Sequence, residues 1–192
     1  MAARLPVWLL LLGALVLAVK LPAARAQPAA ADEHVLKAAY LRTFGQYTVW
    51  PKAAVPGDRF VIGVLGKNQF KAVVEILEKQ EVSGRKVEVK EFKTMQDYRP
   101  CHLLFISSEP AGNNPKEQPG DRLASALAAL KQQPVLLVAD TPGLAGRGAM
   151  LNLYLEKGTV RYEINVEAIK AVGLTPKADL QKYGKPVSAD KK

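Results

Sequence analysis

The sequence predicts an α/β protein with three layers: a mostly parallel sheet flanked by helices, with a C-terminal antiparallel hairpin. Two observations predict the parallel sheet. Residues 59–92 and 102–139 each read as a strand, a helix and a second strand, and such units pair their strands in parallel through right-handed crossovers. The third observation is the alternation of apolar and polar residues over 148–165, which predicts two antiparallel strands joined by a two-residue turn.

The hairpin is the most informative segment of the chain. With Lys157-Gly158 as the turn, one face is apolar and pairs Leu155 with Val160, Leu153 with Tyr162, and Leu151 with Ile164. That face must point into a core. The other face pairs Tyr154 with Arg161, Asn152 with Glu163, and Met150 with Asn165. A polar row of this kind is typical of an ordinary sheet edge or of the wall of a binding site, so its candidate contacts are Asn152, Tyr154, Arg161 and Glu163.

The first half of the chain contributes one helix and the first parallel unit. A helix begins after Asp32, carries an aromatic stripe, and stops at Trp50-Pro51. The stripe, which we expect to pack in the core, is Leu36, Tyr40, Phe44 and Tyr47. A strand over 59–65 then leads through Asn68, a natural N-cap, into a helix that buries Phe70, Val73, Val74 and Leu77. Ser83-Gly84 turns the chain into a strand over 86–92.

The second unit and the C-terminus follow the same logic. A strand over 102–106 is followed by a proline- and glycine-rich loop over 109–120, a helix capped by Asp121, and a continuous apolar strand over 135–139. The helix buries Leu123, Ala126, Leu127 and Leu130. After the hairpin, Asn165 caps a short helix that runs through Ala171, and Thr175-Pro176 begins a last helix. Residues 184–192 are expected to form a flexible basic tail.

Residues 1–26 are predicted to be a cleavable signal peptide. Arg4 precedes an apolar run from Val7 to Val19, and Ala24-Arg25-Ala26 has the small-x-small form that precedes cleavage, here after Ala26. A membrane anchor is the competing interpretation, but it needs about 20 apolar residues, more than this run offers. We therefore expect a periplasmic or extracellular protein with a linker at 27–32, one domain at 33–183, and no transmembrane helix in the mature chain.

Charge and cysteine content exclude several classes of function. Removing residues 1–26 takes away three basic residues and no acid, which leaves 24 basic and 18 acidic residues and a net charge of +6. The excess is scattered, and no aromatic-plus-basic recognition module is present, so nucleic acid is not an expected partner. An anionic membrane surface or an acidic partner fits the charge better. Cys101 is the only cysteine, so no intrachain disulfide can form, and we expect its thiol to be buried.

No constellation in the sequence indicates catalysis, a metal or a cofactor. Two histidines in different elements and one cysteine cannot supply the four ligands of a structural zinc site. Cys101 and His102 are adjacent, and adjacent side chains on a strand point to opposite faces, so they are not a thiol and its base. No G-x-S-x-G elbow is present. The protein is therefore expected not to be an enzyme.

Two glycine loops remain as candidate ligand sites. Gly66-Lys67-Asn68 joins a strand to a helix, where backbone N–H groups favour an anion, although a plain glycine turn explains it as well. The second loop, Gly143 to Gly148, contains Arg147. Ligands of open α/β sheets bind beyond the carboxyl ends of the parallel strands. If both loops lie at that edge, Lys67, Asp140 and Arg147 line one cleft.

Five segments together resemble the YfiR-like family of periplasmic regulatory proteins, over nearly all of residues 33–183. They are Lys37-Ala38-Ala39-Tyr40-Leu41 with Phe44 and Trp50-Pro51, Ile62-Gly63-Val64-Leu65-Gly66, Cys101-His102-Leu103-Leu104-Phe105-Ile106-Ser107, Gly148-Ala149-Met150-Leu151-Asn152-Leu153, and Arg161-Tyr162-Glu163-Ile164-Asn165. Relatives in this family carry further cysteines whose disulfides stabilise or tune the regulator. With Cys101 alone, an intramolecular disulfide switch is excluded in this chain.

The resemblance implies an exported, non-enzymatic regulator that acts on an inner-membrane signalling protein. The best understood relatives hold a diguanylate cyclase inactive by binding its periplasmic sensor region, and release raises cyclic di-GMP and starts biofilm growth. Other members serve histidine kinases or outer-membrane systems, and members commonly form homodimers. The alternative function is a periplasmic small-ligand-binding protein that takes a nucleotide or an aromatic metabolite at the Gly66 and Gly143–Gly148 loops.

Overall fold

The computed structural model describes residues 30–51, 57–112 and 116–188, so the predicted signal peptide and the end of the predicted tail lie outside the described residues. The helices are α1 (Ala30–Gln46), η1 (Lys71–Val73, a 3-10 turn), α2 (Val74–Glu78), α3 (Pro119–Leu130), α4 (Val166–Ala171) and α5 (Ala178–Tyr183). The strands are β1 (Thr48–Val49), β2 (Arg59–Leu65), β3 (Glu81–Val82), β4 (Arg85–Phe92), β5 (Leu103–Ile106), β6 (Leu136–Ala139), β7 (Leu151–Glu156), β8 (Thr159–Ile164), β9 (Thr175–Pro176) and β10 (Lys185–Pro186).

One large sheet organises the described residues, as the sequence predicts. Its eight strands run in the order β10-β8-β7-β6-β5-β2-β4-β3, and β4, β2, β5, β6 and β7 are mutually parallel. The chain enters at β2, crosses to β4 on one side, and returns to β5 on the other side. The strand order therefore reverses between β2 and β5, where ligands of open α/β sheets usually bind.

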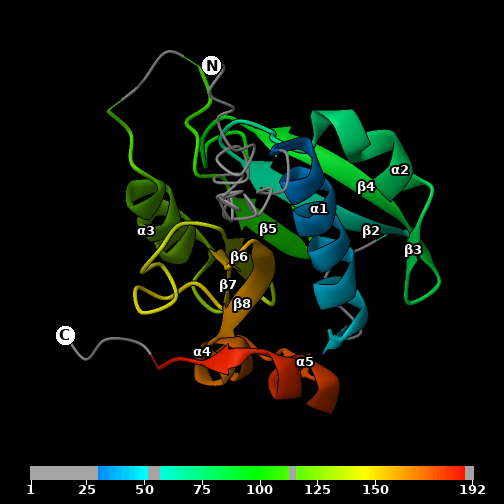
Figure 1. Cartoon of the computed structure of the whole chain (residues 1–192), viewed down its shortest axis with the longest axis vertical. Coiled ribbons are helices and arrows are strands. Elements are labelled where there is room, and N and C mark those ends of the chain that lie inside the picture. The colour runs from blue at the N-terminus through cyan, green and yellow to red at the C-terminus, as the bar shows by residue number, and fades with distance from the viewer. Residues whose placement is uncertain (1–29, 52–56, 113–115, 189–192) are drawn as a thin grey trace, which may run out of the picture.

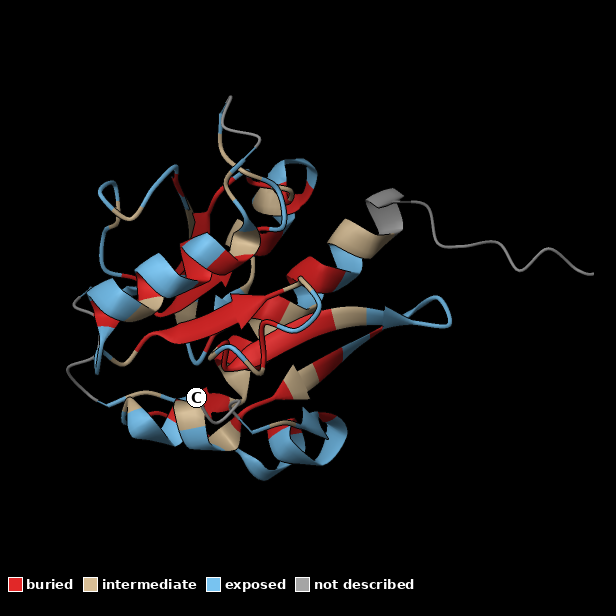
Figure 2. Ribbon diagram, turned by 90° about the vertical axis from the view of Figure 1, so that its left-hand side faces the viewer, coloured by how far each residue is buried: buried red, intermediate tan, exposed pale blue. Residues whose placement is uncertain are grey.

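The sheet is the middle of three layers (Figures 1 and 2). α1 and α2 lie beside one another on one face, where α1 contacts β8 and β3, and α2 contacts β4. α3 lies on the opposite face, and α4 packs beside it near Leu137 and Met150. The central strands β5 and β6 are buried throughout, because helices cover both of their faces. This arrangement confirms the predicted α/β fold class.

The hairpin forms in the predicted register. Leu151 pairs with Ile164, Leu153 with Tyr162, and Tyr154 with Arg161, and Lys157-Gly158 is the turn. Asn165 also has its predicted role, since its side-chain oxygen accepts the Ala168 N–H at 2.9 Å at the start of α4. Figure 2 shows the hairpin changing from buried at its base to exposed at its tip. Its base is therefore a core element and its tip a surface.

The α1 helix buries most of the predicted stripe, with Leu36 as the exception. Phe44 is fully buried, and Tyr40 and Tyr47 are half-buried and pack against the core, whereas Leu36 is 44% exposed. The buried face also includes Leu41 and small residues that the predicted stripe leaves out. Gly45 shows the reason: a Cβ there would lie 2.8 Å from the Phe60 ring, so the helix approaches β2 closely at this glycine.

Helix boundaries differ from prediction at two capping residues, Asn68 and Asp121. Asn68 accepts the Phe70 N–H at 2.9 Å in a turn before η1, and does not cap a long helix. α3 begins at Pro119, so Asp121 lies inside its first turn, where its carboxylate accepts the Gln118 N–H at 3.2 Å. Leu127 of this helix is only half-buried.

The C-terminal segment contains two short strands that the sequence did not predict. Thr175-Pro176 does not begin the last helix but forms β9, which pairs with β1, and α5 begins at Ala178. Residue 184 does not begin a free tail either, because Lys185-Pro186 forms β10 and pairs in parallel with β8. Pairing between segments so far apart leaves no local sequence pattern. Similarly, α1 already begins at Ala30, within the predicted linker.

Candidate functional site

The hairpin divides its four candidate contact residues between the interior and the surface. Asn152 is 1% exposed and donates from Nδ2 to Glu163 Oε2 at 3.3 Å, because β6 and β8 flank its strand. Glu163 is half-buried and also pairs with Lys185 at 3.4 Å. Arg161 is exposed and pairs with Glu156 at 2.6 Å. Tyr154 is half-buried beneath the Lys185 ammonium, 5.9 Å from its ring centroid. Only the outer pair, Tyr154 and Arg161, offers a surface.

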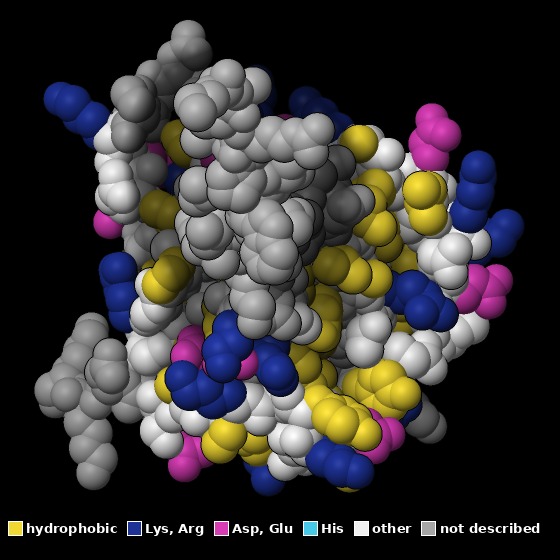
Figure 3. Space-filling model, in the orientation of Figure 1, with side chains coloured by type: hydrophobic (Ala, Val, Ile, Leu, Met, Phe, Trp, Pro, Cys, Tyr) yellow, Lys and Arg dark blue, Asp and Glu magenta, His cyan; other side chains and the backbone are white. Residues whose placement is uncertain are grey.

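A groove runs along the outer edge of β8 and ends at Arg161. β10 covers only the Glu163–Ile164 end of β8, and no other described strand pairs with residues 159–162 on that side. The groove has a volume of about 550 Å³ and lies between α1 and α5; its aromatic walls are Tyr40, Tyr47, Tyr162 and Tyr183. Figure 3 shows hydrophobic side chains in a band over α1 that continues toward α5. Tyr183 is 69% exposed, which makes it the most exposed large hydrophobic residue among those described.

Two tyrosines fix the inner wall of this groove. The Tyr40 hydroxyl donates to the Val160 carbonyl at 3.0 Å, and the Tyr162 hydroxyl donates to the Leu180 carbonyl at 2.8 Å. Burial raises the pKa of Tyr162 to about 12, so this hydroxyl keeps its proton at any physiological pH. These bonds tie α1 and α5 to β8. The outer rings of Tyr47 and Tyr183 remain available to a partner.

At the carboxyl edge of the sheet, the Gly66 loop is closed by the chain itself. The Gly66 N–H donates to the Phe92 carbonyl and the Lys67 N–H to the Glu109 carbonyl, each at 3.0 Å. Gly66 has a φ of +104°, and a Cβ there would lie 2.7 Å from the Glu109 carbonyl oxygen. The Lys67 ammonium pairs with the Glu109 carboxylate. The amides that would hold an anion are therefore occupied, and the plain glycine turn is the better explanation of this motif.

The three residues of the predicted cleft have three different environments. Lys67 is exposed beside Glu109, and Arg147 lies against the start of α3, where a Cβ on Gly120 would be 2.1 Å from its Nη1. The Asp140 carboxylate is fully buried and accepts from Lys37 Nζ at 2.7 Å and Gln69 Nε2 at 3.0 Å. Burial opposes the charge of Lys37, but the Asp140 and Glu33 carboxylates outweigh burial and raise the Lys37 pKa. Asp140 therefore ties α1 to the end of β6.

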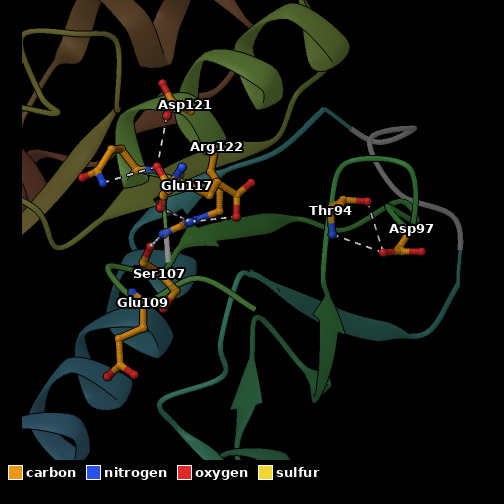
Figure 4. Close-up of polar contacts among 9 residues, drawn as sticks. Thr94, Asp97, Ser107, Glu109, Glu117, Asp121 and Arg122 are labelled. Atoms are coloured by element: carbon orange, nitrogen blue, oxygen red, sulfur yellow. Dashed lines mark hydrogen bonds and ion pairs between the residues drawn. The ribbon is translucent and has the colours of Figure 1, made fainter. Parts of the chain in front are cut away.

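Arg122 is a buried cation that the sequence analysis missed. It is 2% exposed; its Nη2 donates to the Ser107 carbonyl at 2.7 Å, and its Nη1 to Glu117 Oε2 at 3.1 Å (Figure 4). Its four-residue spacing from Ala126 on α3 was the available signal. The guanidinium holds the loop that follows β5 against α3. Its Nε faces Gly66, 3.2 Å from the position of a Cβ there, so little space remains for a ligand.

A second cavity, of about 310 Å³, lies at the opposite edge of the sheet. Phe60 is the second residue of β2, Arg85 begins β4, and His102 precedes β5, so these residues meet at the amino ends of three neighbouring strands. Thr48 and Val49 of β1 and Lys177, after β9, form the outer wall. From sequence, His102 was considered as a zinc ligand and as a partner of Cys101. This cavity was not anticipated, because the β1–β9 pair that closes it was not predicted.

Metal ligands do not converge in the part of the chain that the structure describes. No group of three or more His, Cys, Asp or Glu side chains there is placed to hold a metal ion. Cys101 is a buried free thiol, as predicted, and burial raises its pKa to about 12, so it is not a nucleophile at neutral pH. Nor do the described helices include one with the length and apolar character of a membrane span.

Comparisons with known proteins identify the family. The family model described as YfiR/HmsC-like matches residues 34–185. Among solved structures, the chain is similar to a conserved domain protein from Vibrio cholerae O1 biovar eltor strain N16961, with 12% identity, a TM-score of 0.48, and coverage of 78% of this chain and 59% of that one. It is also similar to the ABC domain in complex with L-Trp from Streptococcus pneumonia, with 12% identity, a TM-score of 0.45, and coverage of 76% and 61%.

The chain spans about three fifths of the length of those two structures. No curated protein matches it. The family match is the informative result, because it extends from α1 to the first residue of β10 and includes all the other strands of the main sheet. It confirms the resemblance inferred from the five sequence segments. The chain belongs to the YfiR/HmsC-like family.

Proposed function

We propose that this protein is an exported, non-enzymatic regulator that binds the periplasmic sensor region of an inner-membrane signalling protein and modulates its activity. The signalling protein is a diguanylate cyclase or a histidine kinase, and the regulator self-associates as a dimer. The observation that carries the proposal is the match of residues 34–185 to a family of periplasmic regulatory proteins. The predicted signal peptide at 1–26 supports export to the compartment where such a sensor region lies.

The surface that best fits a protein partner is the β8 edge with its tyrosine groove. An open strand edge offers backbone hydrogen bonds to an incoming chain, and tyrosine and arginine are the side chains that most often dominate binding energy at interfaces. Arg161 and Tyr183 are both exposed at this groove. The predicted contact Arg161 is therefore retained. Asn152 is set aside because it is buried, and Lys67 and Arg147 because they lie elsewhere.

The proposal is tested with the periplasmic region of an inner-membrane diguanylate cyclase or histidine kinase from the same organism. We expect the purified chain to bind that region, and Arg161→Ala combined with Tyr183→Ala to weaken the affinity by about tenfold or more. Calorimetric titration measures the dissociation constant. The folded state should be nearly unaffected, because exposed ion pairs such as Arg161–Glu156 contribute little to stability.

Lys79→Ala is the matched control, since Lys79 is exposed at the end of α2 and away from the groove. Glu163→Ala is a poor probe of binding, because removing a half-buried carboxylate leaves the buried Asn152 amide without its partner. A normal thermal midpoint with unchanged affinity in the double variant would reject this surface. Failure of the wild-type chain to bind the sensor region would reject the proposed function.

The alternative function, a small ligand held by the Gly66 and Gly143–Gly148 loops, is not favoured by the geometry. The N–H groups of Gly66 and Lys67 already donate to backbone carbonyls. In the second loop, the Gly148 N–H donates to Ala145 at 3.2 Å, and a Cβ on Gly148 would lie 3.0 Å from Leu127. Both loops are thus occupied by contacts within the chain.

A further inference from the structure

The cavity at the amino edge of the sheet contains a hydrogen-bonding conflict. His102 is 2% exposed, and its Nδ1 accepts the backbone N–H of Val61 at 3.0 Å. Its Nε2 lies 3.0 Å from Nη1 of Arg85. Burial and the nearby Arg85 charge lower the pKa of His102 to about 4, so the ring is neutral at physiological pH and carries one proton.

The position of that proton follows from the Val61 contact. Because a backbone amide can only donate, Nδ1 must be unprotonated and the proton of the neutral ring must be on Nε2. The guanidinium of Arg85 is also only a donor. The Nε2–H of His102 and the Nη1–H of Arg85 therefore face each other with no acceptor between them. A bound acceptor, and above all an anion, would receive both hydrogen bonds.

The remaining polar groups of the cavity also favour an anion. Its lining includes two cations, Arg85 and Lys177, and no aspartate or glutamate. No described carboxylate forms an ion pair with Arg85 or Lys177. Thr48 lines the cavity and is 3% exposed, and its hydroxyl has no hydrogen-bond partner among the described residues. An unpartnered hydroxyl in such a buried position is costly unless a ligand or a water satisfies it.

Two aromatic rings supply an apolar wall. The Phe60 ring stacks on His102 with centroids 4.7 Å apart, and Trp50 packs edge-on against Phe60 at 5.3 Å. The Trp50 indole N–H donates to the His102 carbonyl at 3.3 Å, which fixes the wall in place. A concave site with an apolar wall and a few convergent donors is the usual form of a small-molecule site.

We propose that the cavity formed by Thr48, Trp50, Phe60, Arg85, His102 and Lys177 binds a small carboxylate that carries an aromatic or other apolar body. The carboxylate lies beside the facing nitrogens of Arg85 and His102, which are 3.0 Å apart, and accepts from both, and the apolar body lies toward Trp50 and Phe60. This site is at the opposite edge of the sheet from the glycine loops and is separate from the β8 groove. It gives the regulator a place to sense a metabolite.

Phenylacetate and its neutral amide, phenylacetamide, form a matched pair of probes. They have nearly the same shape, and only phenylacetate carries the charge that the site is inferred to recognise. Charge-assisted hydrogen bonds are worth about 1.5–3 kcal/mol, so we expect phenylacetate to bind about tenfold or more tightly than phenylacetamide. Inorganic phosphate, an anion without an apolar body, should bind more weakly than phenylacetate. Titration calorimetry on the purified chain alone measures all three, so the result does not depend on the partner of the proposed function.

Arg85→Met is the decisive variant, because it keeps an apolar stem and removes the charge. It should weaken phenylacetate binding by about tenfold or more. Without ligand, its thermal midpoint should equal or exceed that of the wild type, because the variant removes the facing donor at His102. Lys86→Met is the control: Lys86 is the next cation on β4, is exposed, and should not affect binding.

Three results would overturn the proposal. They are the absence of phenylacetate binding to the wild type, equal affinity for the acid and the amide, and unchanged phenylacetate affinity in a folded Arg85→Met variant. Phosphate binding as tight as phenylacetate binding would contradict the role of the aromatic wall. A large loss of stability in Arg85→Met without ligand would contradict the inferred role of Arg85 in binding an anion, since that result would mean that Arg85 supports the fold itself.

Discussion

At the residue scale, the neighbours of His102 determine its tautomer and its orientation. Val61 fixes the unprotonated nitrogen, Arg85 faces the other nitrogen, and Phe60 stacks on the ring. The lowered pKa of His102 is therefore a consequence of burial first and of the Arg85 charge second. In sequence, only its position before an apolar strand is visible. None of these neighbours is near it in the chain, so the environment of His102 could not be predicted.

The pKa of His102 predicts a specific dependence of stability on pH. Above the ordinary histidine pKa of 6.5 the ring is neutral in both the folded and the unfolded chain. Between 6.5 and about 4, the unfolded chain binds a proton that the folded chain does not, so the free energy of unfolding falls as the pH falls. The loss attributable to His102 reaches at most about 3 kcal/mol below this window. Urea unfolding at a series of pH values measures it.

His102→Asn separates this effect from the titration of carboxylates in the same range. The asparagine oxygen can replace Nδ1 as the acceptor for Val61 N–H, but it does not titrate. The wild type should therefore lose stability relative to the variant as the pH falls from about 7 to 4. Parallel curves for the two proteins over that range would contradict the assignment of a buried, neutral His102.

At the element scale, sequence patterns predicted the structure where an element is determined by its own residues. The hairpin register follows from local alternation and the Lys157-Gly158 turn, and it is correct in every pair. The two-residue strands β1, β9 and β10 follow from no local pattern. β1 pairs with β9 and β10 pairs with β8, so their existence depends on how distant segments meet. The same limit explains Asn152: its pairing with Glu163 is visible in sequence, but the pairing of its strand with β6 on the other side is not.

The attachment of β10 to the sheet gives an element-scale prediction. Gly184 lies between α5 and β10 and is buried, and a Cβ there would lie 2.6 Å from both Ile164 Cγ2 and Tyr162 Cε2. Gly184→Ala should therefore displace β10 and destabilise the fold by about 1–3 kcal/mol. Urea unfolding measures the change, with the exposed Ser188→Ala as control. An unchanged unfolding curve for Gly184→Ala would mean that the C-terminal strand is not held against β8.

At the scale of the whole molecule, the cavity lies at the amino edge of the sheet, whereas topology suggests a ligand site at the carboxyl edge. The carboxyl edge contains the strand-order reversal between β2 and β5, yet Gly66, Lys67 and Glu109 close it through their own contacts. The amino edge contains the cavity with unmatched donors. Fold topology therefore predicted a ligand site at the carboxyl edge, but the side chains form the cavity at the amino edge. The β8 groove is a third surface, on the side of the sheet where the hairpin ends.

The predicted site residues also differ in how far the sequence could place them. Arg161 is exposed as expected, because the hairpin tip extends beyond the helices that cover the sheet. Lys67, Asp140 and Arg147 were predicted to line one cleft, but each contacts a different part of the chain. Sequence spacing does not show which loops meet. Family membership was predictable, because five short segments in the right order carry it over most of the chain.

The central claim is that this chain regulates a membrane signalling protein by binding its periplasmic region. The most direct measurement is the enzymatic output of a cyclase or kinase from the same organism in proteoliposomes, with its sensor region outward, as purified chain is added. We expect a saturable change in cyclic di-GMP or phosphotransfer output, shifted to higher concentration by Arg161→Ala with Tyr183→Ala. An output that stays constant at every concentration of the chain would contradict it.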